Sequence, residues 1–241
     1  MKTKLVIYQV FTRTFGNKNL TKKENGTLAE NGVGKMNDFD EEVLRRIHDF
    51  GVTHLWYTGV IRHATCTDYS AFGIPTQNPR VVKGRAGSPY AITDYYDIDP
   101  DIAVDVDARM AEFEALVTRT HAEGMKMIID FVPNHVARQY KSIAKPEGVE
   151  DLGESDDTSK HFDAQNNFYY CPNEKLDLSG VVENSYAHGA EPYNEFPAKC
   201  TGNDRFDSHP QQNDWYETIK LNYGVDYCDA GGRSYHYHPI P

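Results

Sequence analysis

The chain has 241 residues, which is long enough to bury a substantial core. Its 25 Lys and Arg residues against 36 Asp and Glu residues give a net charge of 25 − 36 = −11. This negative charge disfavours sequence-independent binding to the phosphate backbone of nucleic acids. We therefore expect no nucleic-acid partner. No stretch of the sequence approaches the roughly 18 apolar residues that a membrane span needs, so we expect no membrane partner either.

The N-terminus and the cysteines bear on the cellular compartment. Residues 1–5 lead into a strand with no long apolar core behind them, so we see no signal peptide. The cysteines form no Cys-x-x-Cys pair, and four in a chain of this length favour free thiols over a disulfide framework. These features predict a cytoplasmic protein, although a secreted parent without its signal would share them. The four cysteines are Cys66, Cys171, Cys200 and Cys228.

The chain begins with alternating strand and helix patterns. Residues 5–11 form a near-continuous apolar strand, and residues 40–50 carry apolar side chains at helical spacing. Asp38 or Asp40 is placed to cap this helix, and Gly51 to end it. A second strand follows directly, at residues 53–57.

A long polar connection, rich in glycine and proline, leads to the next helix, which we expect at residues 107–123. The third strand is expected at residues 125–132. Strands that are buried on both faces and joined by helices indicate a parallel sheet, with its reactive edge at the carboxyl ends of the strands. The helix should end at Gly124, and the side chains expected to point inward from it are Met110, Phe113, Leu116 and Val117.

A polar motif follows the apolar run of the third strand. Residues 130–135 read Asp-Phe-Val-Pro-Asn-His. A buried strand that ends in Asp, Asn and His presents polar groups at its carboxyl end, which is where barrel enzymes built from β/α units place their active sites. This motif points to an active site.

Residues 136–241 have a different character. They hold no clean helical or strand period and are rich in Asp, Asn, Gly, Tyr and Pro. A segment this long cannot be a simple loop in a compact barrel, so the residues alone leave two alternatives, an inserted subdomain or a disordered segment.

Five blocks of sequence together resemble the α-amylase family of glycosidases, glycoside hydrolase family 13, in the order that the family shows. The resemblance implies an α/β fold: a TIM-type β/α barrel, of which this chain holds the first three β/α units. It also implies an irregular inserted subdomain between the third strand and the third helix, so the expected domains are residues 1–135 and 136–241. The blocks are residues 5–15 (LVIYQVFTRTF), 51–60 (GVTHLWYTGV), 88–100 (SPYAITDYYDIDP), 130–135 (DFVPNH) and 213–227 (NDWYETIKLNYGVDY).

The resemblance also implies the chemistry. The family cleaves or transfers α-glucosidic bonds with retention, which requires a nucleophilic carboxylate and a carboxylic acid about 5 Å apart. By the family pattern these groups follow later strands, so we expect no catalytic residue in this chain. The sequence stops at Pro241, about where the third helix should begin, and we expect it to be the N-terminal part of a longer enzyme that acts on α-linked oligo- or polysaccharides. The alternative is a catalytically inactive carbohydrate-binding or scaffold protein with the same fold. The sequence does not indicate whether the protein is a monomer or an oligomer.

The resemblance assigns part of a substrate site. Tyr90 matches a tyrosine whose ring lies under the sugar at the cleavage point, and a flat ring suits the apolar face of a pyranose. His135 matches a histidine that hydrogen-bonds a hydroxyl of the same sugar. Asp94 either bonds sugar hydroxyls or braces its loop. Asp130 is expected to support the site as an inward carboxylate that orients its neighbours. For Tyr90, the alternative is an ordinary core tyrosine, since the chain has 16.

No metal or other cofactor is expected. In family members with a structural calcium, an Asn at the position of Asn134 and an Asp in a later segment supply oxygen ligands. Here that segment, residues 219–222, places Lys220 where the carboxylate should be, so its ammonium takes the place of the ion's charge. A zinc site built from His236 and His238 with Cys200 or Cys228 is not expected, because the sequence shows no paired ligand run.

Overall fold

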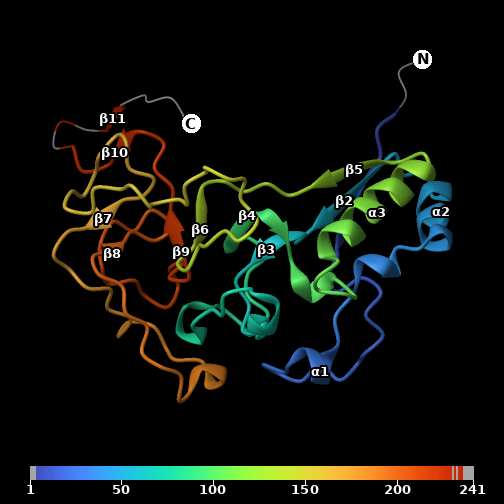
Figure 1. The fold of residues 1–241 in the computed structure, drawn as a ribbon, viewed down its shortest axis with the longest axis horizontal. Helices are drawn as coiled ribbons and strands as arrows, with labels where there is room; N and C mark the ends of the chain where they lie inside the picture. Colours follow the sequence, from blue (N-terminus) through green and yellow to red (C-terminus); the bar gives the residue numbers. More distant parts are fainter. Residues whose placement is uncertain (1–3, 230, 232, 236–241) are drawn as a thin grey trace.

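The computed structural model describes residues 4–229, 231 and 233–235. In Figure 1 the molecule is elongated, with a parallel sheet and its helices toward one end and a set of short strands toward the other. The sheet has the order β1-β2-β5, and both pairs of neighbours run parallel, as the alternating pattern predicted. Its strands are β1 (Ile7–Phe11), β2 (His54–Thr58) and β5 (Lys126–Ile129).

Helix α2 (Glu41–Asp49) joins β1 to β2. Of the two candidate caps, Asp40 is the one used: its side chain accepts a hydrogen bond from the backbone N–H of Val43 at 2.8 Å. Gly51 has a φ of +88°, a conformation that favours glycine, and lets the chain turn into β2. Asp38 instead accepts a bond from the N–H of Lys35 at 2.7 Å, at the 3-10 turn η1 (Met36–Asp38). The short helix α1 (Leu28–Asn31) precedes it.

Helix α3 (Arg109–Ala122) joins the second strand of the sheet to the third. Leu116 is fully buried and Phe113 packs against the same core, as expected. The expectation for Met110 was wrong, because its side chain is 41% exposed. The neighbouring Arg109 turns inward and its Nε donates to Asp97 Oδ1 at 2.7 Å, so the next side chain points away from the core.

The main core lies between the sheet and these helices. The expectation that the strands are buried on both faces was wrong for this chain, since Ile7 is 55% exposed and Ile129 is 37% exposed. Among the described residues, α2 and α3 cover one side of the sheet, and the outer strands β1 and β5 keep apolar side chains open to solvent. The buried core consists of Val10, Met36, Phe39, Leu44, Val52, Leu55, Tyr57, Val60, Ile98, Ile102, Ala103, Leu116 and Met125.

The long connection between β2 and α3 contains an antiparallel pair that the sequence did not predict. Strand β3 (Ile61–His63) pairs with β4 (Ile92–Ile98), and the turns η2 (Ser70–Phe72), η3 (Pro79–Val81) and η4 (Pro100–Ile102) surround them. Buried charges hold this pair: the guanidinium of Arg62 lies 3.0 Å from Asp94 and 3.2 Å from Asp97. Some charged residues of the connection thus form an interior network.

The remainder of the chain is ordered by short antiparallel pairs. Strand β6 (His135–Ala137) pairs with β9 (Thr218–Lys220), β7 (Tyr170–Cys171) with β8 (Ala198–Lys199), and β10 (Val225–Asp226) with β11 (Ser234–Tyr235). The turn η5 (Ser185–Ala187) lies among them. Two small apolar clusters form under these strands, one around Phe168 and one around Tyr169. Within the described residues, no helix has the length and apolar character needed to cross a membrane.

Candidate substrate site

Asp130 and Tyr90 lie together at the carboxyl end of the sheet. Asp130 directly follows β5, and its Oδ1 accepts a hydrogen bond from the indole Nε1 of Trp56 on β2. Its Oδ2 is buried and has no hydrogen-bond partner among the described residues. Tyr90 and Asp130 line one crevice, and burial together with the charge of Asp130 raises the pKa of Tyr90. Asp130 thus contacts Trp56 and lies beside Tyr90, and its supporting role stays a prediction.

His135 begins β6 and lies opposite Lys220 of β9. Its side chain is buried, and burial followed by the positive charge of Lys220 lowers the pKa of His135 to about 4, against a weaker opposing contribution from the backbone of Tyr90. The imidazole is therefore neutral at pH 7. A neutral imidazole has one N–H donor and one acceptor nitrogen, so one ring nitrogen is left for a sugar hydroxyl when Asn134 holds the other. Its Nδ1 contacts Oδ1 of Asn134.

Asp94 lies on β4 and is fully buried. Its carboxylate accepts hydrogen bonds from Ser142 Oγ at 2.7 Å and from the backbone N–H of Ile143 at 2.8 Å, in addition to its ion pair with Arg62. These bonds tie β4 to residues 142–144, and they leave the carboxylate no exposed face. Of the two roles considered for Asp94, the geometry favours bracing over contact with a sugar.

Trp215 is an aromatic residue that the sequence reasoning overlooked. Its ring centroid lies 5.1 Å from that of His135, and the side chain is 42% exposed. Its backbone N–H donates to Asn203 Oδ1 at 3.2 Å, which fixes the start of the turn into β9. Trp215 falls inside the block 213–227 that carried the family resemblance, so an exposed aromatic residue in that block was the available signal.

The residues at the family's calcium position do not fit a calcium ion. Lys220 Nζ forms an ion pair with Asp204 Oδ1 at 2.7 Å, so the nearby carboxylate already has a cation. The side chain of Asn134 contacts His135, and its backbone carbonyl accepts from Leu221 at 3.0 Å. A hard divalent cation needs six to eight oxygen ligands, whereas an ammonium lies at this point.

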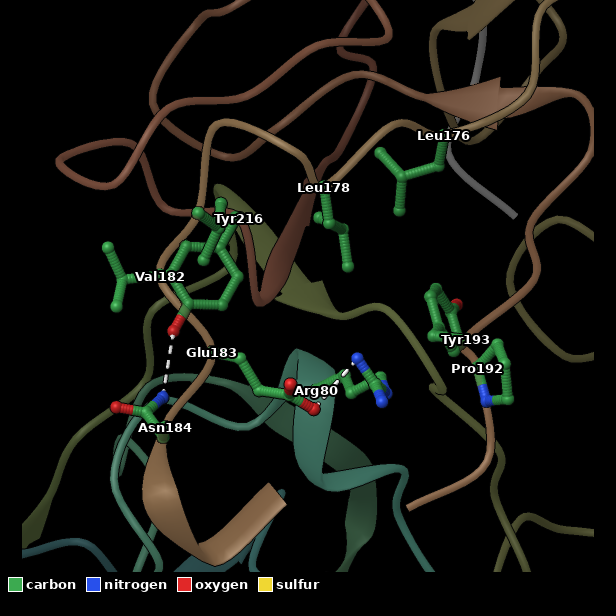
Figure 2. Close-up of a pocket in the computed structure, with 10 residues that line it drawn as sticks. Arg80, Leu176, Leu178, Val182, Glu183, Asn184, Pro192, Tyr193 and Tyr216 are labelled. Atoms are coloured by element: carbon green, nitrogen blue, oxygen red, sulfur yellow. Dashed lines mark hydrogen bonds and ion pairs between the residues drawn. The ribbon is translucent and has the colours of Figure 1, made fainter. Parts of the chain in front are cut away.

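A second pocket, of about 150 Å³, lies between the turn η3 and the irregular part of the chain (Figure 2). Arg80 and Glu183 lie next to one another in its wall and form an ion pair at 2.8 Å. On another wall, Asn184 donates to the hydroxyl of Tyr216 at 3.5 Å. None of the site residues expected from the sequence lines this pocket. The pocket and the candidate site are adjacent in sequence at one point, because Tyr216 of the pocket wall directly follows Trp215.

The family model for the α-amylase catalytic domain matches residues 9–194. The chain belongs to the α-amylase family. The catalytic domain of this family is a TIM barrel, so the parallel sheet and its two helices are part of such a barrel. His161 and Cys171, in the irregular part of the chain, also fall within the match.

Individual relatives are similar over part of their length. Maltase 1 of Drosophila virilis is 28% identical over 151 residues, which cover 61% of this chain and 18% of that protein. A cyclomaltodextrin glucanotransferase of Bacillus sp. (strain 6.6.3) is 29% identical over 55% of this chain and 18% of the relative. The amino acid transporter heavy chain SLC3A1 of Mus musculus is 29% identical over 56% of this chain and 14% of that protein.

A solved α-amylase structure from Lactobacillus plantarum is 30% identical, with a TM-score of 0.38, over 56% of this chain and 24% of that one. The α-amylase-family chain described here thus spans about a fifth of the length of the curated relatives it matches.

Proposed function

We propose that this chain is the first three β/α units and the inserted subdomain of an α-amylase-family enzyme. The proposed reaction is retaining hydrolysis or transfer at the α-glucosidic bonds of α-glucans or oligosaccharides. The observation that carries the proposal is the grouping of Tyr90, Asp130 and His135 at the carboxyl end of the sheet, in a chain that matches the family model over residues 9–194. The proposed domains are residues 1–135 and 136–241.

In this proposal the aromatic residues hold the sugar. Tyr90 supplies a flat ring under one glucose residue, and Trp215 offers a second, more exposed ring beside His135. His135 exchanges hydrogen bonds with a sugar hydroxyl, and its lowered pKa keeps the imidazole neutral for that role. Asn134 and Lys220 support His135 from the adjacent residue and the paired strand.

The retaining reaction needs two carboxyl groups about 5 Å apart. Asp130 is the acidic residue among those that line the crevice at Tyr90, and its bond with Trp56 supports a positioning role. The proposal therefore places the nucleophile and the acid outside the described residues. Residues 4–229 contribute substrate binding and orientation.

Glucan binding tests the proposal directly. Binding of maltooligosaccharides to the chain is measured by titration calorimetry, together with turnover of aryl α-glucosides. Tyr90→Ala and Trp215→Ala should each weaken binding roughly 2- to 12-fold, since a stacked ring contributes about 0.5–1.5 kcal/mol. Tyr8→Ala is the matched control, because Tyr8 is a 45% exposed tyrosine on β1, away from these residues. Equal affinity of the wild type and the three variants for maltooligosaccharides would contradict the assignment of Tyr90 and Trp215 to sugar binding. Turnover of aryl α-glucosides by this chain would show that the reacting carboxylates lie within it.

One relative favours a second candidate, a catalytically inactive carbohydrate-binding or scaffold protein. The amino acid transporter heavy chain SLC3A1 carries a name that describes no glycosidase. Turnover of α-glucosides by the complete product of the gene separates the two candidates. An active product supports the enzyme, whereas glucan binding without turnover supports the inactive protein.

A further inference from the structure

Three metal-binding side chains meet in the irregular part of the chain, and a fourth lies beside the histidine among them. Cys171 on β7 and Cys200, which follows β8, bring their sulfur atoms to 3.9 Å. One ring nitrogen of His161 completes a group of three atoms that all lie within 4.8 Å of one another. The Sγ of Cys228 lies 3.1 Å from Nε2 of the same histidine. In Figure 1, β7, β8 and β10 lie together at the end of the molecule away from α2, and Cys228 follows β10.

These separations match a tetrahedral zinc centre. Zinc–sulfur bonds of about 2.3 Å place two thiolates of a tetrahedron about 3.8 Å apart, and a thiolate and an imidazole nitrogen about 3.6 Å apart. The sulfur atoms of Cys171 and Cys200 are at 3.9 Å. Cys228 lies outside the group of three atoms, but its side chain is exposed and can turn toward the other two sulfur atoms. A disulfide would require about 2.05 Å between the sulfur atoms, far less than the distance between Cys171 and Cys200.

A buried cation lies near the two buried thiols. Arg138 Nη1 donates to the carbonyl of Lys199, the residue before Cys200, at 3.1 Å and to Glu195 Oε1 at 2.7 Å. The Nη2 of Arg138 is buried and has no hydrogen-bond partner among the described residues.

An aromatic layer borders the cluster. The ring of His161 lies 6.2 Å from Phe206, which stacks on Tyr227 at 4.7 Å. Tyr169 packs edge-on against Phe206 at 5.3 Å. Cys171 and Cys200 belong to the same buried cluster as Tyr169. Such a layer limits the access of water and oxidants to Cys171 and Cys200, and it packs against the histidine ring.

We propose that this cluster binds one structural zinc ion through His161, Cys171, Cys200 and Cys228. The donor set decides the metal, because thiolates with an imidazole favour zinc over the hard cations that oxygen ligands select. Four protein ligands leave no open position, so the role is structural. The ion would join segments that have little regular secondary structure, and it would hold Cys200, whose backbone carbonyl accepts from Lys220 at 3.0 Å, next to the strand that faces His135.

Metal content tests the proposal without any measurement of activity. The full chain is purified with zinc and a thiol reductant, freed of unbound metal, and analysed by mass spectrometry for zinc per chain. We expect one zinc ion per chain. Cys228→Ser should lower the zinc affinity by at least about 10-fold, since changes that only surround a metal site already cost that much. Cys66→Ser is the matched control, because Cys66 is a free thiol outside the cluster and its loss should leave zinc content unchanged.

A second measurement needs no substitution in the buried pair. Alkylation of the exposed Cys228 is followed by peptide mass spectrometry, and zinc should slow it, whereas alkylation of Cys66 should not respond to zinc. Cobalt added in place of zinc should show thiolate-to-metal charge-transfer absorption that Cys228→Ser reduces. Three results would each overturn the proposal: a reduced chain without zinc, Cys228→Ser with undiminished zinc affinity, or a Cys171–Cys200 disulfide in the chain purified with reductant.

Discussion

Leu116 of helix α3 and Arg138, which follows β6, are both buried, but different chemistry surrounds them. Leu116 lies among apolar side chains that come from the sheet and its helices. The side chain of Arg138 is fully buried, and its Nη1 binds Glu195 Oε1 at 2.7 Å and the carbonyl of Lys199 at 3.1 Å. The β/α part of the chain is thus stabilised mainly by apolar burial, and the irregular part depends on buried polar partners as well.

Short polar loops show the same contrast. In the irregular part, Asp156 accepts hydrogen bonds from the backbone N–H groups of Asn167 and Phe168, at 2.7 and 3.0 Å, and Asn166 accepts one from Asp157 at 2.8 Å. These side chains replace the ladders that long strands would supply. Apolar burial has no direction and tolerates small shifts, whereas each of these bonds needs a particular partner in a particular place. The two parts should therefore respond differently to substitution.

The largest effect is expected for Arg138→Leu in the irregular part. The substitution leaves the buried Glu195 without its cation, and breaking a buried ion pair from one side costs about 3–5 kcal/mol. The free energy of unfolding is measured by denaturant titration. Lys160→Met is the control, because Lys160 pairs with Asp157 and Asp163 at the surface and its loss should leave the unfolding curve unchanged. Equal stability of Arg138→Leu and the wild type would show that this region does not depend on the pair.

Leu116→Ala probes the β/α part in the same way. Truncation of a fully buried leucine leaves a cavity and costs about 2–5 kcal/mol. Met110→Ala on the same helix removes a 41% exposed side chain and should cost no more than about 0.5 kcal/mol. Hydrogen exchange would sharpen the comparison: loss of protection confined to residues 4–135 would show that the two parts open separately, and loss throughout would show a single cooperative unit.

The third effect depends on pH and involves His135, where the two parts meet. Its pKa is lowered from 6.5 to about 4 by burial and by Lys220, so the unfolded chain binds more protons than the folded chain between these values. Stability should therefore fall as the pH drops through this window, by about 3 kcal/mol in total. Melting is compared with that of His135→Gln, which removes the group. An unchanged pH slope in the variant would show that other groups cause the loss.

Much of the β/α part was predictable from the sequence because apolar burial follows a local period. The strands, the caps at Asp40 and Gly51 and the parallel order of the sheet all follow from patterns within short windows. Met110 was misjudged because its neighbour Arg109 turns inward to an acid on β4, which no helical period reveals. The pair β3–β4 was missed for a similar reason. An arginine in a polar segment indicates a loop, and only the fold shows that Arg62 is buried in an ion pair with Asp94.

The residues of the candidate site also differ in whether the sequence could predict them. Tyr90 and His135 could be assigned because the family resemblance supplies their roles, and Trp215 was missed because the pattern alone gives an exposed aromatic residue no role. The zinc cluster had no local signal: Cys171 and Cys200 are 29 residues apart, and His161 and Cys228 are 67 apart. Pairing of β7 with β8 brings the first two together. His236 and His238, which were considered for zinc, lie outside the described residues.

The smallest effect is expected from calcium. Lys220 already supplies a positive charge beside Asn134 and Asp204. Added calcium should therefore shift the melting temperature of the wild type by no more than about a degree, because an ion that does not bind the native state cannot stabilise it. Added calcium is compared with added magnesium, since a chelator would also remove zinc. Lys220→Asp should gain a calcium-dependent rise, because it places a carboxylate next to Asp204 and the amide of Asn134. Lys199→Asp on β8 is the matched control, with no rise expected. A calcium-dependent rise in the wild type that Asn134→Ala removes would show that the ammonium does not exclude the ion.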